Sequence, residues 1–287
     1  MTPFDYEFLR QILKERSGLV LATEKEYLVE SRLMPVARRN GCASIGELVQ
    51  RLKAPAPDAL KIEVTEAMMN NESFFFRDKN PFDRFGDTIL PDLLDKRAKS
   101  RRIRIWSAAA STGQEAYSLA MMAAGFTKLA DWQIEIVATD ISRDALDKAR
   151  AGFYSQFEVQ RGLPIQMLMQ HFDQVGEQWR ISDKLRSMVQ FRQLNLLDAF
   201  SILGLFDVVF CRNVLIYFDQ ATKVDVLERV RRVLQPDGYL ILGAAETVIG
   251  LSNVFAPVAD KRGLYMAKPR KESTAPLAAA AGKARVA

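Results

Sequence analysis

Short strand-like segments alternate with helix-like ones from about residue 102 onward, and this alternation constrains the fold more than any other feature of the chain. The strand-like segments, rich in β-branched and aromatic residues, cover 102–108, 134–140, 206–212 and 238–244. Segments with a helical spacing of apolar residues follow the first three, at 113–124, 142–150 and 220–234. Because parallel strands need crossover helices, this alternation predicts right-handed βαβ units and a parallel sheet covered on both faces.

Two further segments modify this pattern. Residues 254–269 have the pattern of two strands around a turn, so we expect an antiparallel hairpin to finish the sheet. Residues 163–194 have a helical pattern followed by strand-like patterns, which predicts an insertion into the α/β unit. We therefore expect an α/β domain over 91–268.

The first 80 residues are helical in pattern throughout. Gly18 is expected to end the first helix, and Pro35 to kink or break the second. Asn80, followed by a proline, is typical of a helix start, and we expect that helix to reach about Lys99. An all-α domain over 1–80, with a linker extending to about residue 90, therefore precedes the α/β domain.

Histidine and cysteine are scarce, which excludes several kinds of site. The cysteines, Cys42 and Cys211, are far apart and outside any CxxC pattern, so they predict neither a disulfide framework nor a zinc site. His171 is the only histidine, which argues against His-based metal centres and against Ser-His or Cys-His catalysis. We expect no metal site and a reaction that needs neither imidazole nor thiol.

The remaining composition is typical of a globular protein: the 287 residues are 48% hydrophobic and 26% charged. The N-terminus mixes charges among its apolar residues and no apolar run approaches membrane-spanning length, so we expect a cytoplasmic protein that does not insert into membranes. Much of the net charge of +5 lies in the alanine-rich segment 269–287, with 4 basic and 1 acidic residues, which we expect to be a disordered tail. We interpret a basic run at 96–104 as a solvated helix end that runs into a strand.

Ligands of open α/β sheets bind beyond the carboxyl ends of the strands, so the residues at these ends are the first candidates for a site. The first strand ends in Ser107 and continues through a loop of small residues that lets the backbone approach a ligand closely. Gly113 is the only glycine of that loop, so the GxGxxG pattern of dinucleotide sites is absent. Asp140 ends the second strand, where it can accept hydrogen bonds from ribose hydroxyls or serve as a helix N-cap. A nucleoside site without phosphate cradling suggests S-adenosylmethionine.

Five segments, in the right order, resemble the motifs of the CheR-type chemotaxis receptor methyltransferases. They are NESFFFRD at 71–78, WSAAASTGQEAYSLA at 106–120, ATD at 138–140, NLLD at 195–198 and CRNVLIYFD at 211–219. The similarity runs from about residue 5 to 268 and covers both domains. It implies a Rossmann-like class I methyltransferase domain with a small antiparallel β-subdomain inserted at about 163–194, preceded by an all-α domain.

The resemblance also implies an activity. Members of this family are cytoplasmic protein-glutamate O-methyltransferases, which transfer a methyl group from S-adenosylmethionine to glutamate side chains of chemoreceptors and release S-adenosylhomocysteine. The expected partners are the cytoplasmic methylation helices of membrane chemoreceptors, and we expect a monomer that binds no nucleic acid. Some members also hold a C-terminal receptor peptide on the β-subdomain, for which 178–191 could supply an edge strand.

Carried over residue by residue, the resemblance implies a set of site residues. The cofactor-binding positions are Asn71, Ser73, Arg77, Glu115, Asp140, Asn195, Leu196, Arg212 and Asn213. Glu115 would contact the methionyl end and Asp140 the ribose, while Asn195 with Leu196 would contact the adenine. Arg77 and Tyr217 are the residues assigned to catalysis. The sequence departs from the family pattern at Gln114, where an acid is frequent, and at Phe74, where a smaller residue is common.

Several of these assignments have a structural alternative. Arg77 could be a surface charge paired with Asp78, Tyr217 could simply pack in a core, and Asp219 is interpreted as a helix cap only. Three basic residues of the second helix, Arg32, Arg38 and Arg39, could meet an acidic receptor helix or form a solvated face.

Two other functions stay open at this point. A nucleic-acid methyltransferase of the amino-methylating type would carry an Asp/Asn-Pro-Pro-aromatic motif, where this chain has Arg-Asn-Val-Leu at 212–215. A non-catalytic sensor that binds the cofactor is the second alternative.

Overall fold

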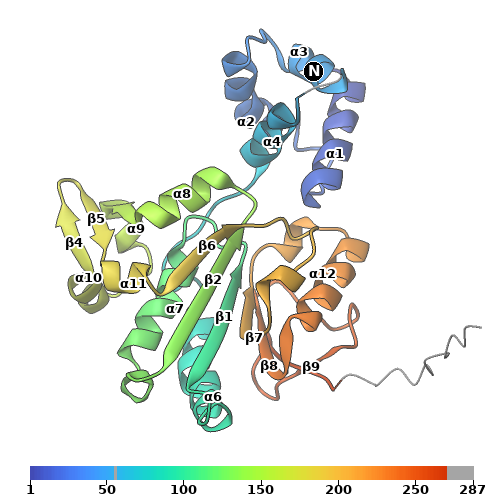
Figure 1. The fold of residues 1–287 in the computed structure, drawn as a ribbon. Helices are drawn as coiled ribbons and strands as arrows, with labels where there is room; N and C mark the ends of the chain where they lie inside the picture. Colours follow the sequence, from blue (N-terminus) through green and yellow to red (C-terminus); the bar gives the residue numbers. More distant parts are fainter. Residues whose placement is uncertain (55–56, 270–287) are drawn as a thin grey trace, which may run out of the picture.

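Four helices form the N-terminal domain in the computed structural model, which describes residues 1–54 and 57–269. They are α1 (Pro3–Ser17), α2 (Glu26–Arg39), α3 (Ile45–Lys53) and α4 (Asp58–Met68). Their buried side chains form a core of their own, and Figure 1 shows the domain as a separate lobe. Gly18 ends α1 as predicted, with a left-handed φ of 77°, whereas α2 continues unbroken through Pro35.

A helical stretch connects this lobe to the sheet. It begins at Asn80 and runs through α5 (Asn80–Arg84), the π-helical turn η1 (Phe85–Ile89) and α6 (Leu90–Lys96). The stretch ends three residues before the expected Lys99.

Within the described residues, no helix is long and apolar enough to span a membrane. All but the first residue of the predicted disordered tail, 269–287, lies outside those residues.

The α/β domain is built on a seven-stranded sheet in the order β6-β2-β1-β7-β8-β10-β9. Its strands are β1 (Arg102–Ala108), β2 (Gln133–Asp140), β6 (Val189–Gln193), β7 (Phe206–Cys211), β8 (Leu234–Leu242), β9 (Phe255–Pro257) and β10 (Leu264–Ala267). The first five in that order are parallel, and β10 is antiparallel to both β8 and β9. The predicted parallel sheet and its closing hairpin are therefore confirmed.

Strand side chains alternate between two cores, one on each face of the sheet. In β1, Ile103 and Ile105 face one core while Trp106 and Ala108 face the other. The first core is shared with η1, α6 and α7 (Gln114–Gly125), and the second with α12 (Gln220–Arg232). The helix α8 (Arg143–Ala151) follows β2, so each predicted crossover helix is present.

A small antiparallel sheet projects from the side of the main sheet (Figure 1) and has the strand order β3-β5-β4. It contains β3 (Phe153–Ser155), β4 (Phe172–Val175) and β5 (Gln178–Ile181), with the short helices α9 (Gln156–Gln160), α10 (Ile165–His171) and α11 (Asp183–Arg186) around it. It begins ten residues before the expected insertion at 163–194, while β6, inside those bounds, belongs to the main sheet. Three residues of β3 are too few to show a strand period.

The basic run at 96–104 is tied into this fold through acidic partners. Arg97 pairs with Asp207 and Asp237, both at 2.6 Å, and Arg104 pairs with Glu135 at 2.9 Å. The run does join the end of α6 to β1 as predicted, but Arg97 and Arg104 are mostly buried in ion pairs and not solvated.

Candidate active site

A cavity of about 330 Å³ lies where the carboxyl ends of β1, β2 and β7 meet the N-terminal domain and the linker. Every residue assigned to the cofactor or to catalysis from the sequence lines it. These residues are Asn71, Ser73, Arg77, Glu115, Asp140, Asn195, Leu196, Arg212, Asn213 and Tyr217. The fold therefore brings together residues from the linker and from the loops after four strands, in a cavity of a size that suits a small ligand.

The loop between β1 and α7 forms one wall. Ala109 and Ser111 have positive φ angles of 59° and 51°, and the φ of Gly113 is 94°. A Cβ atom on Gly113 would lie 2.9 Å from Cβ of Ala149, so only glycine fits at this turn. The small side chains keep the loop close to the strand ends and leave space for a ligand.

Asp140 lies at the end of β2, where it is only 6% exposed. Its two carboxylate oxygens accept hydrogen bonds from the backbone N–H groups of Ser111 (2.8 Å) and Ser142 (2.9 Å). Burial raises the pKa of Asp140 above its ordinary value, and the two N–H donors act against that shift. Ser142, whose side chain accepts from Ala145, is the N-cap of α8, so Asp140 does not serve as that cap. Its unused lone pairs remain available to a ligand.

A buried ion pair joins the start of α7 to the end of β7. Glu115 accepts from Nη1 of Arg212 at 2.8 Å and from the hydroxyl of Ser107 at 2.7 Å. Nη2 of Arg212 donates to the carbonyl oxygen of Arg77 (2.7 Å) and to the Asp78 carboxylate (2.9 Å). The guanidinium thus connects strand, helix and linker, and holds Glu115 at the cavity wall.

The linker is anchored by its aromatic residues. Phe75 is fully buried and makes edge-to-face contacts with Tyr154 and Phe172, at centroid distances of 5.1 and 5.6 Å. Phe76 packs against the same core, which confirms that at least two of the three phenylalanines have a core role. Phe74 lines the cavity instead, while Gln114, the other departure from the family pattern, is buried outside the lining.

Arg77 is half-buried rather than fully buried. Its Nη1 donates to the carbonyl oxygen of Glu72 at 2.9 Å, and its guanidinium lies 5.4 Å from the ring centroid of Phe74. Asp78 pairs with Arg212, so the alternative pairing of Arg77 with Asp78 is wrong. Among residues 1–54 and 57–269, no carboxylate lies within 4.0 Å of Arg77, and its positive charge is therefore available at the cavity.

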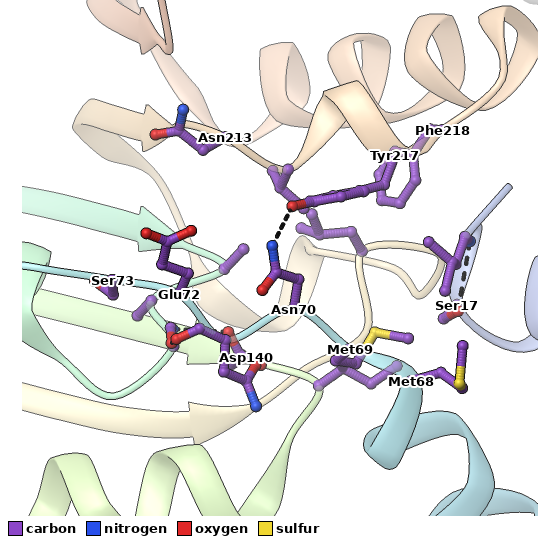
Figure 2. Close-up of a pocket in the computed structure, with 18 of the residues that line it drawn as sticks. Ser17, Met68, Met69, Asn70, Glu72, Ser73, Asp140, Asn213, Tyr217 and Phe218 are labelled. Atoms are coloured by element: carbon purple, nitrogen blue, oxygen red, sulfur yellow. Dashed lines mark hydrogen bonds between the residues drawn. The ribbon is translucent and has the colours of Figure 1, made fainter. Parts of the chain in front are cut away.

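Tyr217 ends the 3₁₀ turn η4 (Leu215–Tyr217), which follows β7. Its hydroxyl accepts a hydrogen bond from Nδ2 of Asn70 at 2.8 Å (Figure 2), and its carbonyl oxygen accepts one from the N–H of Val20 at 2.9 Å. Asp219, two residues later, caps α12 as predicted, and its carboxylate also pairs with Lys14 of α1 at 2.8 Å. The N-terminal domain therefore contacts the segment that carries Tyr217 at several points.

The side chain of Asn195 is turned toward the same domain. Its Nδ2 donates to the carbonyl oxygen of Arg16 at the end of α1, and its Oδ1 accepts from the N–H of Leu197 at 3.0 Å. One N–H of Nδ2 and one lone pair of Oδ1 are left over, so a ligand here can meet these groups and the apolar side chain of Leu196.

Two residues of this site were missed from the sequence. Glu246 accepts four backbone hydrogen bonds of 2.7–3.0 Å and holds the turn after β7, in which Asn213 has a φ of 58°. Its only signal in the sequence is that it is a single acidic residue shortly after β8, the strand that pairs with β7. Asn70 directly precedes the recognised NES motif, and nothing in its spacing points to Tyr217.

Family models and relatives match the chain across both domains. Residues 71–264 match the CheR methyltransferase, SAM binding domain, and residues 5–68 match the CheR methyltransferase, all-alpha domain. Chemotaxis protein methyltransferase 1 of Pseudomonas aeruginosa is 43% identical over 270 residues, which are 92% of this chain and 98% of that protein. Chemotaxis protein methyltransferase Cher2 of Pseudomonas putida is 40% identical over the same shares. The chemotaxis protein methyltransferase of Salmonella typhimurium is 34% identical over 86% of this chain and 84% of that protein. The chain therefore belongs to the CheR family of S-adenosylmethionine-dependent methyltransferases.

Proposed function

We propose that this methyltransferase modifies glutamate side chains of chemoreceptors, forming γ-glutamyl methyl esters, and that it acts as a cytoplasmic monomer. The observation that carries the proposal is the cavity itself, whose lining brings the carboxylates of Glu115 and Asp140 together with Arg77 and Tyr217. The relatives named above, which are chemotaxis protein methyltransferases, support the choice of substrate.

The polar groups of the cavity fit S-adenosylmethionine. Asp140 has lone pairs left for the two ribose hydroxyls, and Glu115 can accept from the ammonium group of the methionyl end. Ile141 and Leu196 offer apolar surface for the adenine ring. The ribose, the ammonium group and the adenine ring of the cofactor thus each have a chemically matched partner in one cavity.

The protein needs to align the reactants more than to activate them. The bound cofactor supplies a methyl group that is activated by its positive sulfonium sulfur. A receptor glutamate, with an ordinary pKa of about 4.3, is ionised at neutral pH, so no general base is required. Its carboxylate oxygen bonds to the methyl carbon as the carbon–sulfur bond breaks, which leaves a neutral ester and a neutral thioether.

Arg77 and Tyr217 have different parts in this alignment. The guanidinium of Arg77, which has no carboxylate partner in the part of the chain that the structure describes, attracts the negatively charged carboxylate, and the Tyr217 hydroxyl orients it. Strong contacts to the attacking oxygen would lower its nucleophilicity, so few donors aimed at the other oxygen serve the reaction best.

The basic face of α2 offers less to a receptor helix than its sequence indicates. Arg32 donates to the carbonyl oxygens of Met68 and Met69, at 2.6 and 3.2 Å, and Arg39 pairs with Glu63 at 2.8 Å. Of the three arginines, Arg38 is exposed, and its side chain has no hydrogen-bond or ion-pair partner among the described residues. Electrostatic recognition by α2 therefore rests mainly on this residue.

The small sheet also differs from the expectation for a receptor peptide. Within 178–191, β5 is paired on both sides, so this strand offers no free edge. The outer strands of the small sheet are β3 and β4, and strand addition by a receptor peptide would take place there.

The proposal is tested by incubating the protein with labelled S-adenosylmethionine and receptor cytoplasmic fragments. We expect base-labile label on the receptor, and none when the receptor glutamates are replaced by alanine. Label on nucleic acid alone, or cofactor binding without transfer to any receptor, would contradict the proposal and favour one of the two alternatives above.

A further inference from the structure

We infer that Asn70 is a positioning residue: its amide donates to the Tyr217 hydroxyl and thereby leaves the hydroxyl proton to point at the substrate carboxylate. The inference rests on the proposed role of Tyr217 and adds a residue that precedes the recognised linker motif.

The geometry of this pair is direct. Nδ2 of Asn70 lies 2.8 Å from the Tyr217 oxygen, although the two residues are 147 positions apart. Figure 2 shows both side chains on the wall of the cavity. Asn70 is exposed and Tyr217 is half-buried, so the pair lies on an open side of the cavity that a macromolecular substrate can reach.

The direction of the hydrogen bond determines what the phenol can do. A tyrosine hydroxyl has one proton to donate and two lone pairs that accept. When it accepts from Asn70, its own proton cannot point at the same nitrogen and is left for another partner. No acceptor for that proton lies within hydrogen-bond reach among the described residues. A receptor carboxylate can only accept, so this polarity suits the substrate.

The N-terminal domain also holds the main chain of Tyr217. The N–H of Val20, which follows α1, donates to the carbonyl oxygen of Tyr217. Two residues before Val20, a Cβ atom on Gly18 would lie 2.9 Å from the ring of Phe218, so the segment after α1 packs closely against the segment that carries Tyr217. Tyr217 is thus fixed by its main chain after α1 and by its hydroxyl after α4. Docking of the helical domain therefore completes a catalytic group of the other domain.

The experiment measures receptor methylation by Asn70→Ala and Asn70→Asp, each in the natural and in the Tyr217→Phe background. We expect kcat to fall about fivefold for Asn70→Ala, because one neutral hydrogen bond is lost. For Asn70→Asp, kcat should fall further, because the new carboxylate accepts the phenolic proton and repels the substrate carboxylate. In the Tyr217→Phe background, Asn70→Ala should cause no additional loss.

Two controls accompany these variants. Asn253→Asp adds the same charge at an exposed position of the α/β domain and should keep wild-type activity. Calorimetry with S-adenosylhomocysteine should give unchanged affinity for both Asn70 variants, since the bond acts on the substrate side.

The possible failures are distinguishable. An equal loss from Asn70→Ala with and without the Tyr217 hydroxyl would overturn the inference and indicate a structural role. Natural activity of Asn70→Asp would overturn it as well. Full activity of Tyr217→Phe by itself would instead remove the catalytic role of Tyr217, on which the inference depends.

Discussion

Arg212 and Glu115 form an ion pair that is withdrawn from solvent: Nη1 and Oε2 are 2.8 Å apart, and the arginine side chain is 1% exposed. The same guanidinium contacts the carboxylate of Asp78 and the carbonyl oxygen of Arg77. The orientation of Glu115 therefore depends on a donor with several N–H groups in a fixed plane. A compact ammonium cannot reproduce that arrangement.

We predict that Arg212→Lys weakens both cofactor binding and stability. The lysine keeps the charge but loses at least one of the three acceptors, which costs about 2 kcal/mol. Affinity for S-adenosylhomocysteine, measured by calorimetry, should fall about tenfold, and the melting temperature should fall by about 4–8 °C. Arg150→Lys, in an exposed pair with Asp147, is the matched control. Wild-type affinity of Arg212→Lys would show that Glu115 is oriented without the planar guanidinium.

The buried carboxyl of Asp140 predicts a pH dependence of cofactor binding. Burial raises its pKa above the ordinary value for aspartic acid, so the carboxylate becomes protonated at a higher pH than an exposed one. Ribose hydroxyls donate to the ionised form, and affinity must therefore fall as the pH falls through this raised pKa. Calorimetric titrations with S-adenosylhomocysteine from about pH 8 to about pH 4 check the trend.

Asp140→Asn is the control for that experiment. It removes the charge at every pH, so we expect binding roughly tenfold to a hundredfold weaker with little change over the acidic range, as for the loss of a hydrogen bond to a charged group. A variant that keeps the full pH dependence would assign the titration to another group.

The main sheet was predictable because each of its strands and crossover helices has a recognisable pattern in its own segment of the sequence. Strands such as β1 and β7 are rich in β-branched and aromatic residues, and the helices between them carry the 3.6-residue period, so the alternation of strands and helices and the parallel direction follow. The small sheet was placed less well, because β3 has three residues and its partner β5 lies more than twenty positions away. Pairing of short strands depends on tertiary contacts that no local period records.

In the site, too, the residues with a local sequence signal were predictable and their tertiary contacts were not. Asp140 was recognisable because a carboxylate at a strand end has a known use, and the motifs identified the rest of the set. The partners of those residues were not recognisable. Arg32 was expected to meet an acidic receptor helix or to form part of a solvated face, yet it donates to two carbonyl oxygens at the end of α4. Asn70 and Glu246 act through contacts with segments 147 and about 30 positions away, and their own neighbours in sequence carry no sign of this.

The carboxylate of Glu246 supports a final prediction, because it holds the turn that leads to Tyr217. Oε1 accepts from the N–H groups of Val214 and Leu215, and Oε2 accepts from those of Asn213 and Gly243. In Glu246→Gln an NH₂ group replaces one oxygen and faces two N–H donors, which leaves both without an acceptor. The loss should be about 2–4 kcal/mol, or roughly 4–16 °C in melting temperature. Thermal unfolding measures this change, with the exposed Glu177→Gln as the matched control.

Receptor methylation by Glu246→Gln should fall more steeply than affinity for S-adenosylhomocysteine, because the distorted turn misplaces Tyr217 while Asp140 and Glu115 keep their partners. An unchanged melting temperature would mean that the turn keeps its shape without the four hydrogen bonds.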